Sequence, residues 1–192
     1  MKRLGNMTFA GFTLAALLLA LTSGCSTSPS GPAPLSPPSG VTLPIRARVA
    51  VQLDPAMVNT QTVEFRGETW QYPDAELMQH AAMRVFREMF TEVGVAQSMD
   101  SPSVTVRLSG NSSVNPVMSE YYANATATVF PGGDTYTQPL GIYSGSGTGS
   151  QPNFSQGGIA SAYERAFRQI GNRMLADPKL LVNLRARPSS GD

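Results

Sequence analysis

Cys25 is the residue with the clearest chemistry in this sequence, and it is the only cysteine among the 192 residues. A thiolate is the best side-chain nucleophile available to accept a lipid. An intramolecular disulfide is excluded because there is no second cysteine. An unpaired thiol would be a liability in an oxidising compartment, so its modification is the first hypothesis to consider.

The residues before Cys25 have the order of a secretory signal. Lys2 and Arg3 form a positive start, and residues 7–21 are almost continuously apolar and uncharged. This run is shorter than the roughly 20 residues that a membrane-spanning helix needs. Small residues follow at 22–24, as a signal peptidase requires, so we expect a cleaved signal.

The segment from Leu21 to Cys25 resembles the lipobox of bacterial lipoproteins. That pattern has an aliphatic residue three places before the cysteine and Gly or Ala directly before it. Gly24 matches, whereas Thr22 occupies the aliphatic position and Leu21 lies one place further out. The resemblance implies that Cys25 receives a diacylglyceryl thioether, becomes the mature N-terminus and is acylated there. The alternative is a plain secretory signal that ends near a free cysteine.

The residue after the cysteine bears on location. In lipoproteins of this kind, Asp at that position retains the protein in the inner membrane, and this chain has Ser26. The resemblance therefore implies lipid anchoring in the bacterial outer membrane, with the domain facing the periplasm.

Composition divides the chain into four parts. We expect a signal peptide at 1–24, the lipidated cysteine with a disordered Ser/Pro/Gly tether at 25–40, a single domain at 41–187 and a disordered tail at 188–192. Loss of the signal leaves 12 basic against 13 acidic residues, from 14 and 13 in the whole chain. This balance gives no indication of a nucleic-acid surface.

Hydrophobic periodicity predicts an α+β domain. Alternation indicates strands, and apolar residues at helical spacing indicate two strong helices. The expected order is a strand at 45–53, a helix from Asp74 to about Gly94, a strand at 103–109, a hairpin of 118–130 with 135–144, and a helix at 159–176. Residues 62–66 are a weaker strand candidate, 180–184 a short packed turn, and 145–158 a Gly/Ser-rich strand end and loop. This β-α-β-β-β-α order predicts a two-layer sandwich, mainly antiparallel, with both helices on one face.

The hairpin segments "EYYANATATVF", "PGGD" and "TYTQPLGIY" resemble those of small envelope lipoproteins, such as the lipopolysaccharide-assembly lipoprotein that supports an outer-membrane barrel. The resemblance covers about residues 45–184. It implies the same architecture and a role beside another envelope protein.

No constellation in the sequence predicts catalysis. His80 is the only histidine, and a general base would need a nucleophile and an orienting group nearby. The sequence has no G-x-S-x-G elbow and no His/Cys cluster for a metal. Gly145–Gly149 does not open a helix directly and includes no lysine, unlike a phosphate loop. We therefore expect a non-enzymatic protein without cofactor or metal; a hydrolase that uses scattered carboxylates is one alternative.

Two sets of residues are candidates for partner binding. Four tyrosines lie on the expected hairpin: Tyr121, Tyr122, Tyr136 and Tyr143. Tyrosine is favoured at a partly solvated protein interface, because it has an apolar ring and a polar hydroxyl. Arg46 and Arg48 share one face of the first strand and could meet an anionic glycolipid if that strand lies at an edge. The expected function is a non-enzymatic partner or scaffold in an envelope assembly or export complex. A self-assembling ring subunit of a polysaccharide or fibre secretion pore is the second alternative.

Overall fold

The structure is a computed structural model that describes residues 32–133, 135, 137–151 and 154–186. The expected signal, Cys25, Tyr136 and the tail at 188–192 lie outside the described residues. Within the described part, no helix is both long and apolar enough to cross a membrane.

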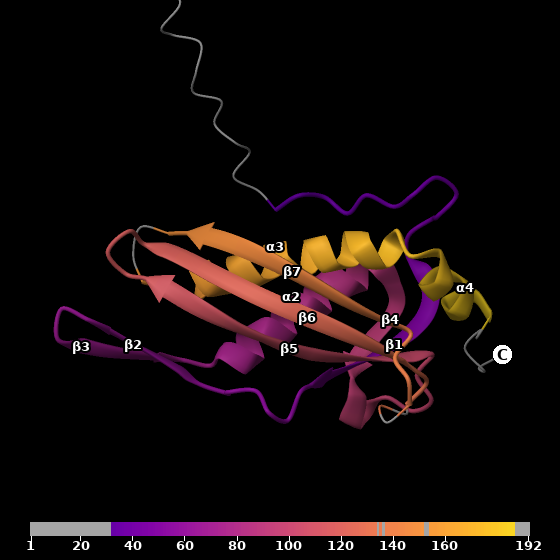
Figure 1. The fold of residues 1–192 in the computed structure, drawn as a ribbon, viewed down its shortest axis with the longest axis horizontal. Helices are drawn as coiled ribbons and strands as arrows, with labels where there is room; N and C mark the ends of the chain where they lie inside the picture. Colours follow the sequence, from indigo (N-terminus) through magenta and orange to yellow (C-terminus); the bar gives the residue numbers. More distant parts are fainter. Residues whose placement is uncertain (1–31, 134, 136, 152–153, 187–192) are drawn as a thin grey trace, which may run out of the picture. The chain divides into compact units, whose positions relative to one another are not determined.

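A five-stranded sheet is the centre of the domain (Figure 1). In spatial order its strands are β4 (Phe90–Val95), β1 (Ile45–Leu53), β5 (Val104–Asn115), β6 (Glu120–Pro131) and β7 (Gly141–Ser150). β1 pairs in parallel with both β4 and β5, whereas β5, β6 and β7 form an antiparallel meander. A separate antiparallel hairpin joins β2 (Gln61–Phe65) to β3 (Glu68–Tyr72).

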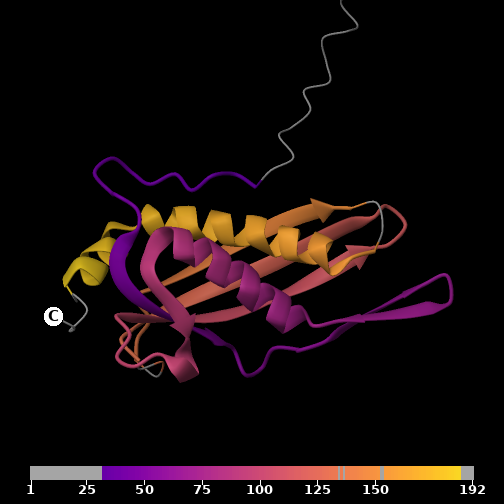
Figure 2. The ribbon, with the colours of Figure 1, turned by 180° about the vertical axis from the view of Figure 1, so that it is seen from behind.

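Two helices, α2 (Asp74–Met89) and α3 (Gln156–Leu175), cover one face of this sheet (Figure 2). The core lies between the two layers. Met78, Val85 and Phe86 from α2 are fully buried, as are Phe167 and Ile170 from α3. The predicted two-layer α+β class and the approximate element order are confirmed.

The segment after α2 differs from the sequence-based expectation. The helix ends at Met89, and residues 90–95 form edge strand β4 instead of a last helical turn. The β-branched Thr91, Val93 and Val95 favour an extended chain. Pairing with β1 then satisfies the backbone of this segment, an interaction that helical periodicity does not reveal.

The residues that follow α3 begin another helix. The short packed turn expected at 180–184 is part of a helix, α4 (Pro178–Ala186), which begins directly after Asp177. The Oδ1 atom of Asp177 accepts hydrogen bonds from the backbone N–H groups of Lys179 (2.9 Å) and Leu180 (3.3 Å). This is N-capping, with proline at the first helical position, where its missing N–H costs nothing.

The Gly/Ser-rich segment forms a regular strand, which corrects the expectation of a strand end and loop for its first half. β7 pairs with β6 from Gly141 to Ser150. A Cβ atom on Gly145, Gly147 or Gly149 would lie only 2.0–2.4 Å from a backbone oxygen of α3. These glycines therefore allow the helix backbone to lie directly on the strand.

Three side chains of α3 bond to the outer edge of β7. Arg165 donates to the carbonyl oxygen of Thr148 (2.6 Å), Gln169 accepts from the N–H of Ser146 (3.3 Å), and Arg173 donates to the carbonyl of Ser144. Free backbone groups on an edge strand invite pairing with another chain. The three side chains are four residues apart on α3, so they form hydrogen bonds with backbone groups at successive positions along the edge of β7.

Part of the expected tether contacts the domain. Asn172 of α3 accepts from the N–H of Ser36 (2.7 Å) through Oδ1. Leu35 reaches Gly171, where an added Cβ would lie 2.9 Å from the leucine side chain. Residues 34–36 thus run against α3 in the structure.

Candidate binding groove

A groove of about 460 Å³ lies where the β2–β3 hairpin faces the turn between β5 and β6. Its lining is mainly apolar and aromatic: Val63, Phe65, Trp70, Pro116 and Phe154, with Arg66 and Glu68 at the hairpin turn. A second hollow of about 310 Å³ shares Phe65, Arg66, Pro116 and Phe154 with it. Together they form one region with two adjoining hollows, which we call the distal groove.

The hairpin that carries half of this groove is specified locally. Arg66 (φ 52°) and Gly67 (φ 80°) both have positive φ, as a two-residue type I′ turn requires. The turn sets the register that pairs Val63 with Trp70 and Phe65 with Glu68. The side chains of Val63 and Trp70 therefore lie on the same face of the hairpin.

Phe154 connects the hairpin to the domain through a group of aromatic rings. Its ring centroid lies 5.0 Å from that of Trp70 and 6.3 Å from those of Tyr72 and Tyr121. Tyr121 is fully buried, and its hydroxyl oxygen accepts from the N–H of Ser155 (3.0 Å). The floor of the groove is therefore fixed to the start of α3.

Apolar side chains around the groove remain accessible. Trp70 is 39% exposed, and Val117 and Met118 on the β5–β6 turn are 75% and 64% exposed. Covering such side chains contributes about 25 cal/mol per Å² of apolar surface. Clustered exposed apolar groups of this kind are typical of an interaction surface.

A buried polar cluster holds the base of the hairpin. The carboxylate of Asp74, fully buried at the start of α2, accepts from the hydroxyls of Ser112 (2.6 Å) and Tyr163 (2.8 Å). The Tyr72 hydroxyl shares a 3.1 Å hydrogen bond with the Ser112 hydroxyl. Burial, with the nearby Asp74 charge, raises the pKa of Tyr163 far above its usual value. β3, α2, β5 and α3 are thereby joined at one point.

The structure separates the four predicted tyrosines. Tyr121 and Tyr143 are core residues, so they leave no surface for a partner, which corrects their assignment as binding residues. Tyr122 is 39% exposed on the opposite face of the sheet, and Tyr136 lies outside the described residues. Alternation along β6 explains the outcome, because neighbouring residues of a strand face opposite sides.

The arginine pair does not have the position that the glycolipid hypothesis required. β1 lies between β4 and β5, not at an edge. Arg48 makes a two-pronged ion pair with Glu92 (2.8 and 3.0 Å), which raises the pKa of the arginine. Arg46 is exposed. The Arg48 fork is thus occupied by a carboxylate within the domain.

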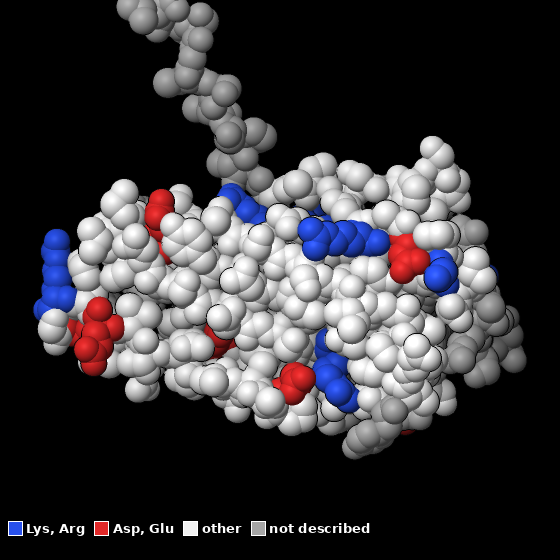
Figure 3. Space-filling model, viewed as in Figure 1, with Lys and Arg blue, Asp and Glu red and all other residues white. Residues whose placement is uncertain are grey.

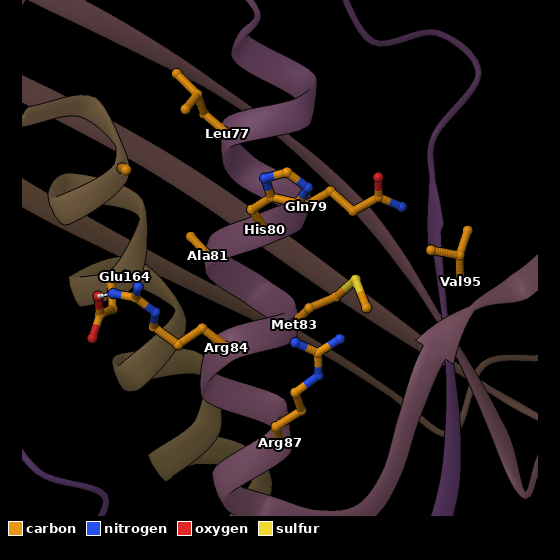
Figure 4. A pocket seen from close by; sticks show the side chains of 10 residues that line it. Leu77, Gln79, His80, Ala81, Met83, Arg84, Arg87, Val95 and Glu164 are labelled. Atoms are coloured by element: carbon orange, nitrogen blue, oxygen red, sulfur yellow. Dashed lines mark hydrogen bonds and ion pairs between the residues drawn. The ribbon is translucent and has the colours of Figure 1, made fainter. Parts of the chain in front are cut away.

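His80 lies in a separate, shallow hollow of about 670 Å³ on the outer side of α2 (Figure 4). Arg84 and Arg87 project from the same helix, and Arg84 pairs with Glu164 of α3 (3.1 Å). None of the residues that line this hollow is Ser, Thr or Cys, so His80 has no nucleophile beside it there. The Arg84 side chain is 72% exposed, whereas that of its partner Glu164 is 16% exposed.

Among the described residues, no three His, Cys, Asp or Glu side chains form a group that could hold a metal ion. The distal groove is lined by the exposed apolar side chains of Trp70 and Val117. Sequence reasoning missed its main residues, Trp70 and Phe154. The signal for Trp70 was the Arg66-Gly67 turn between two alternating segments; no local pattern marks Phe154.

No protein-family model and no curated protein matches the sequence. Several solved structures are similar to it, including the following two. One is a Xanthomonas campestris protein of the family DUF330, with 12% identity and a TM-score of 0.46, covering 83% of this chain and 94% of that chain. The other is a Caulobacter crescentus CB15 protein described as a "putative lipoprotein", with 13% identity and a TM-score of 0.36, covering 73% and 93%. Because both TM-scores are below 0.5, neither similarity bears on function.

Proposed function

We propose that the chain is a bacterial lipoprotein, anchored through Cys25 in the outer membrane, whose periplasmic domain binds another envelope protein without catalysing a reaction. The anchor rests on the signal-like start of the sequence and on the lipobox resemblance at Leu21–Cys25. The binding role rests on one observation, the partly exposed aromatic and apolar distal groove.

The chemistry of the groove favours an apolar segment of a protein as its occupant. Trp70 offers a partly exposed ring, the kind of anchor that dominates protein interfaces. Arg66 and Glu68 at the rim supply one charge of each sign, which suits a polar border around an apolar centre. The Arg66 guanidinium stacks 5.0 Å from the Phe65 ring, which holds the rim against the groove wall.

A cross-linking experiment in intact cells tests this proposal. The chain carries a C-terminal tag, and proteins cross-linked to it are purified from the outer membrane. We expect one envelope protein at a fixed ratio, and we expect Val117→Asp to reduce its recovery about tenfold because a charge opposes burial at the groove. Trp70→Ala, which removes the aromatic anchor, should have the same effect.

The matched control is Val182→Asp, because Val182 lies on α4 and is 65% exposed, close to the 75% of Val117. Equal recovery with Val117→Asp and the wild type would contradict binding at the groove. Self-cross-links alone would instead favour the ring subunit. A complete lack of partners would reopen the hydrolase alternative.

A further inference from the structure

The sheet face that the helices leave uncovered has a large area without charge. Figure 3 shows this face, largely white over β5, β6 and β7. Its outward positions at 109–113 on β5, 122–128 on β6 and 142–150 on β7 are Ser, Thr or Asn, apart from Tyr122 and Ile142. This stretch offers many hydrogen-bonding groups, and the charged residues on the same face of these three strands, Arg107 and Glu120, lie at its two ends.

Strand register arranges these groups in rows. Ser113, Tyr122 and Thr148 are directly opposite one another on the three strands. Asn111, Asn124 and Ser146 form the adjacent row. Directly opposed side chains lie about 5 Å apart, so neighbouring hydroxyl and amide groups are within reach of one small ligand.

A groove of about 390 Å³ lies beside Tyr122, where the β6 and β7 members of these rows line it. Its other polar lining comes from Asn124, Ser146 and Thr148, and from Arg165 and Gln169 of α3. The latter two are held by their hydrogen bonds to the backbone of Thr148 and Ser146. The groove therefore has one wall that is fixed before any ligand enters.

Tyr122 is also held in place. Its hydroxyl donates to the Glu120 carboxylate (2.5 Å), and this bond raises the pKa of Tyr122. The ring is 39% exposed, so a fixed aromatic surface lies beside neutral polar groups. A platform of this kind accepts an apolar ring face, while its neighbours bond to polar substituents.

The charge and polarity of the groove indicate which class of ligand it can bind. A second protein would need an apolar patch on this face, because the centre of a protein interface is largely apolar. An anionic polymer would need several cations, and Arg165, the one cation that lines the groove, is bonded to Thr148. We propose that this groove binds a neutral oligosaccharide, with one sugar ring stacked on Tyr122 and sugar hydroxyls bonded to Asn124, Ser146 and Thr148.

Isothermal titration calorimetry tests the proposal on the full chain, purified in a zwitterionic detergent that has no sugar head group. The probes are maltohexaose, cellohexaose and the fully N-acetylated chitin hexamer, which are all uncharged. We expect at least one to bind with a Kd between about 10 μM and 1 mM. Tyr122→Ala should weaken that binding at least about tenfold, and Tyr122→Phe less, because the ring remains.

Ile142→Ala is the matched control, because Ile142 is an exposed apolar residue on the same sheet face and does not line the groove. If Tyr122→Ala fails to fold, Asn124→Ala takes its place and should also weaken binding. The proposal is overturned if none of the three sugars binds at millimolar concentration. Equal loss in the groove and control variants, or binding of polygalacturonate alone, would overturn it as well.

Discussion

The carboxylate of Asp177 links Tyr143 of β7 to the start of α4. The Tyr143 hydroxyl donates to Asp177 (2.7 Å), while the other carboxylate oxygen caps α4. The hydrogen bond lowers the pKa of Asp177, and burial raises the pKa of Tyr143 far above its usual value. A carboxyl whose pKa is lower in the folded than in the unfolded state adds stability above the unfolded pKa. That stability is lost as the pH falls through the folded pKa.

Tyr143→Phe removes this donor and keeps the ring. We expect the free energy of unfolding at pH 7 to fall by about 1 kcal/mol. The difference from the wild type should shrink as the pH falls below about 4, the unfolded pKa of Asp. Urea unfolding at pH 7 and pH 3 measures it. Tyr122→Phe, which loses an exposed hydroxyl, should change stability little, and a difference for Tyr143→Phe that is the same at both pH values would refute the linkage.

At the scale of elements, the contact between α3 and β7 depends on small residues on both sides. Gly145, Gly147 and Gly149 face the helix, and Ala162 and Ala166 face the strand. Glycine weakens an isolated strand, so these residues are costly unless close packing compensates. The close approach of α3 provides that compensation, and it places Arg165, Gln169 and Arg173 within reach of the β7 edge.

Gly147→Val should separate the helix from the strand, because the new Cβ would lie 2.0 Å from the Ala162 carbonyl oxygen. We expect a loss of about 3 kcal/mol in the free energy of unfolding, the upper range for overpacking. Ser146→Val, on the opposite, exposed face of the same strand, should change it by less than about 0.5 kcal/mol. Chemical denaturation compares the two variants, and equal stabilities would show that α3 does not need the glycines.

At the scale of the whole molecule, the contact of residues 34–36 with α3 limits how far the domain can lie from the lipid anchor. Eight residues, 26–33, separate Cys25 from Pro34, the first residue of this contact. Because each residue adds at most about 3.5 Å, the chain between them spans no more than about 30 Å. The proposed lipid therefore keeps the domain closer to the membrane than a free tether of residues 26–40 would.

Cys25→Ala should abolish lipidation, so the protein should become soluble or remain unprocessed. Cell fractionation and mass spectrometry of the N-terminal peptide measure both outcomes. Ser26→Ala, which leaves the thiol in place, should behave like the wild type. A Cys25→Ala protein that stays in the membrane at its mature size would contradict the anchor.

Local patterns were sufficient for much of the fold. The alternation at 45–53, the apolar stripe that begins at Asp74, and the stripe at 159–176 each identified an element and its buried face. These patterns work because a half-buried strand or helix must repeat its apolar residues at its own period. The α+β class follows from the order of such elements.

Tertiary structure decided the rest. Residues 90–95 are a strand because β1 offers a partner, and the glycines of β7 are ordered because α3 lies on them. The distal groove joins Trp70, Pro116 and Phe154, and the Tyr122 groove joins β6, β7 and α3. Contacts between residues so far apart depend on how whole elements pack, and no local period in a sequence encodes that packing.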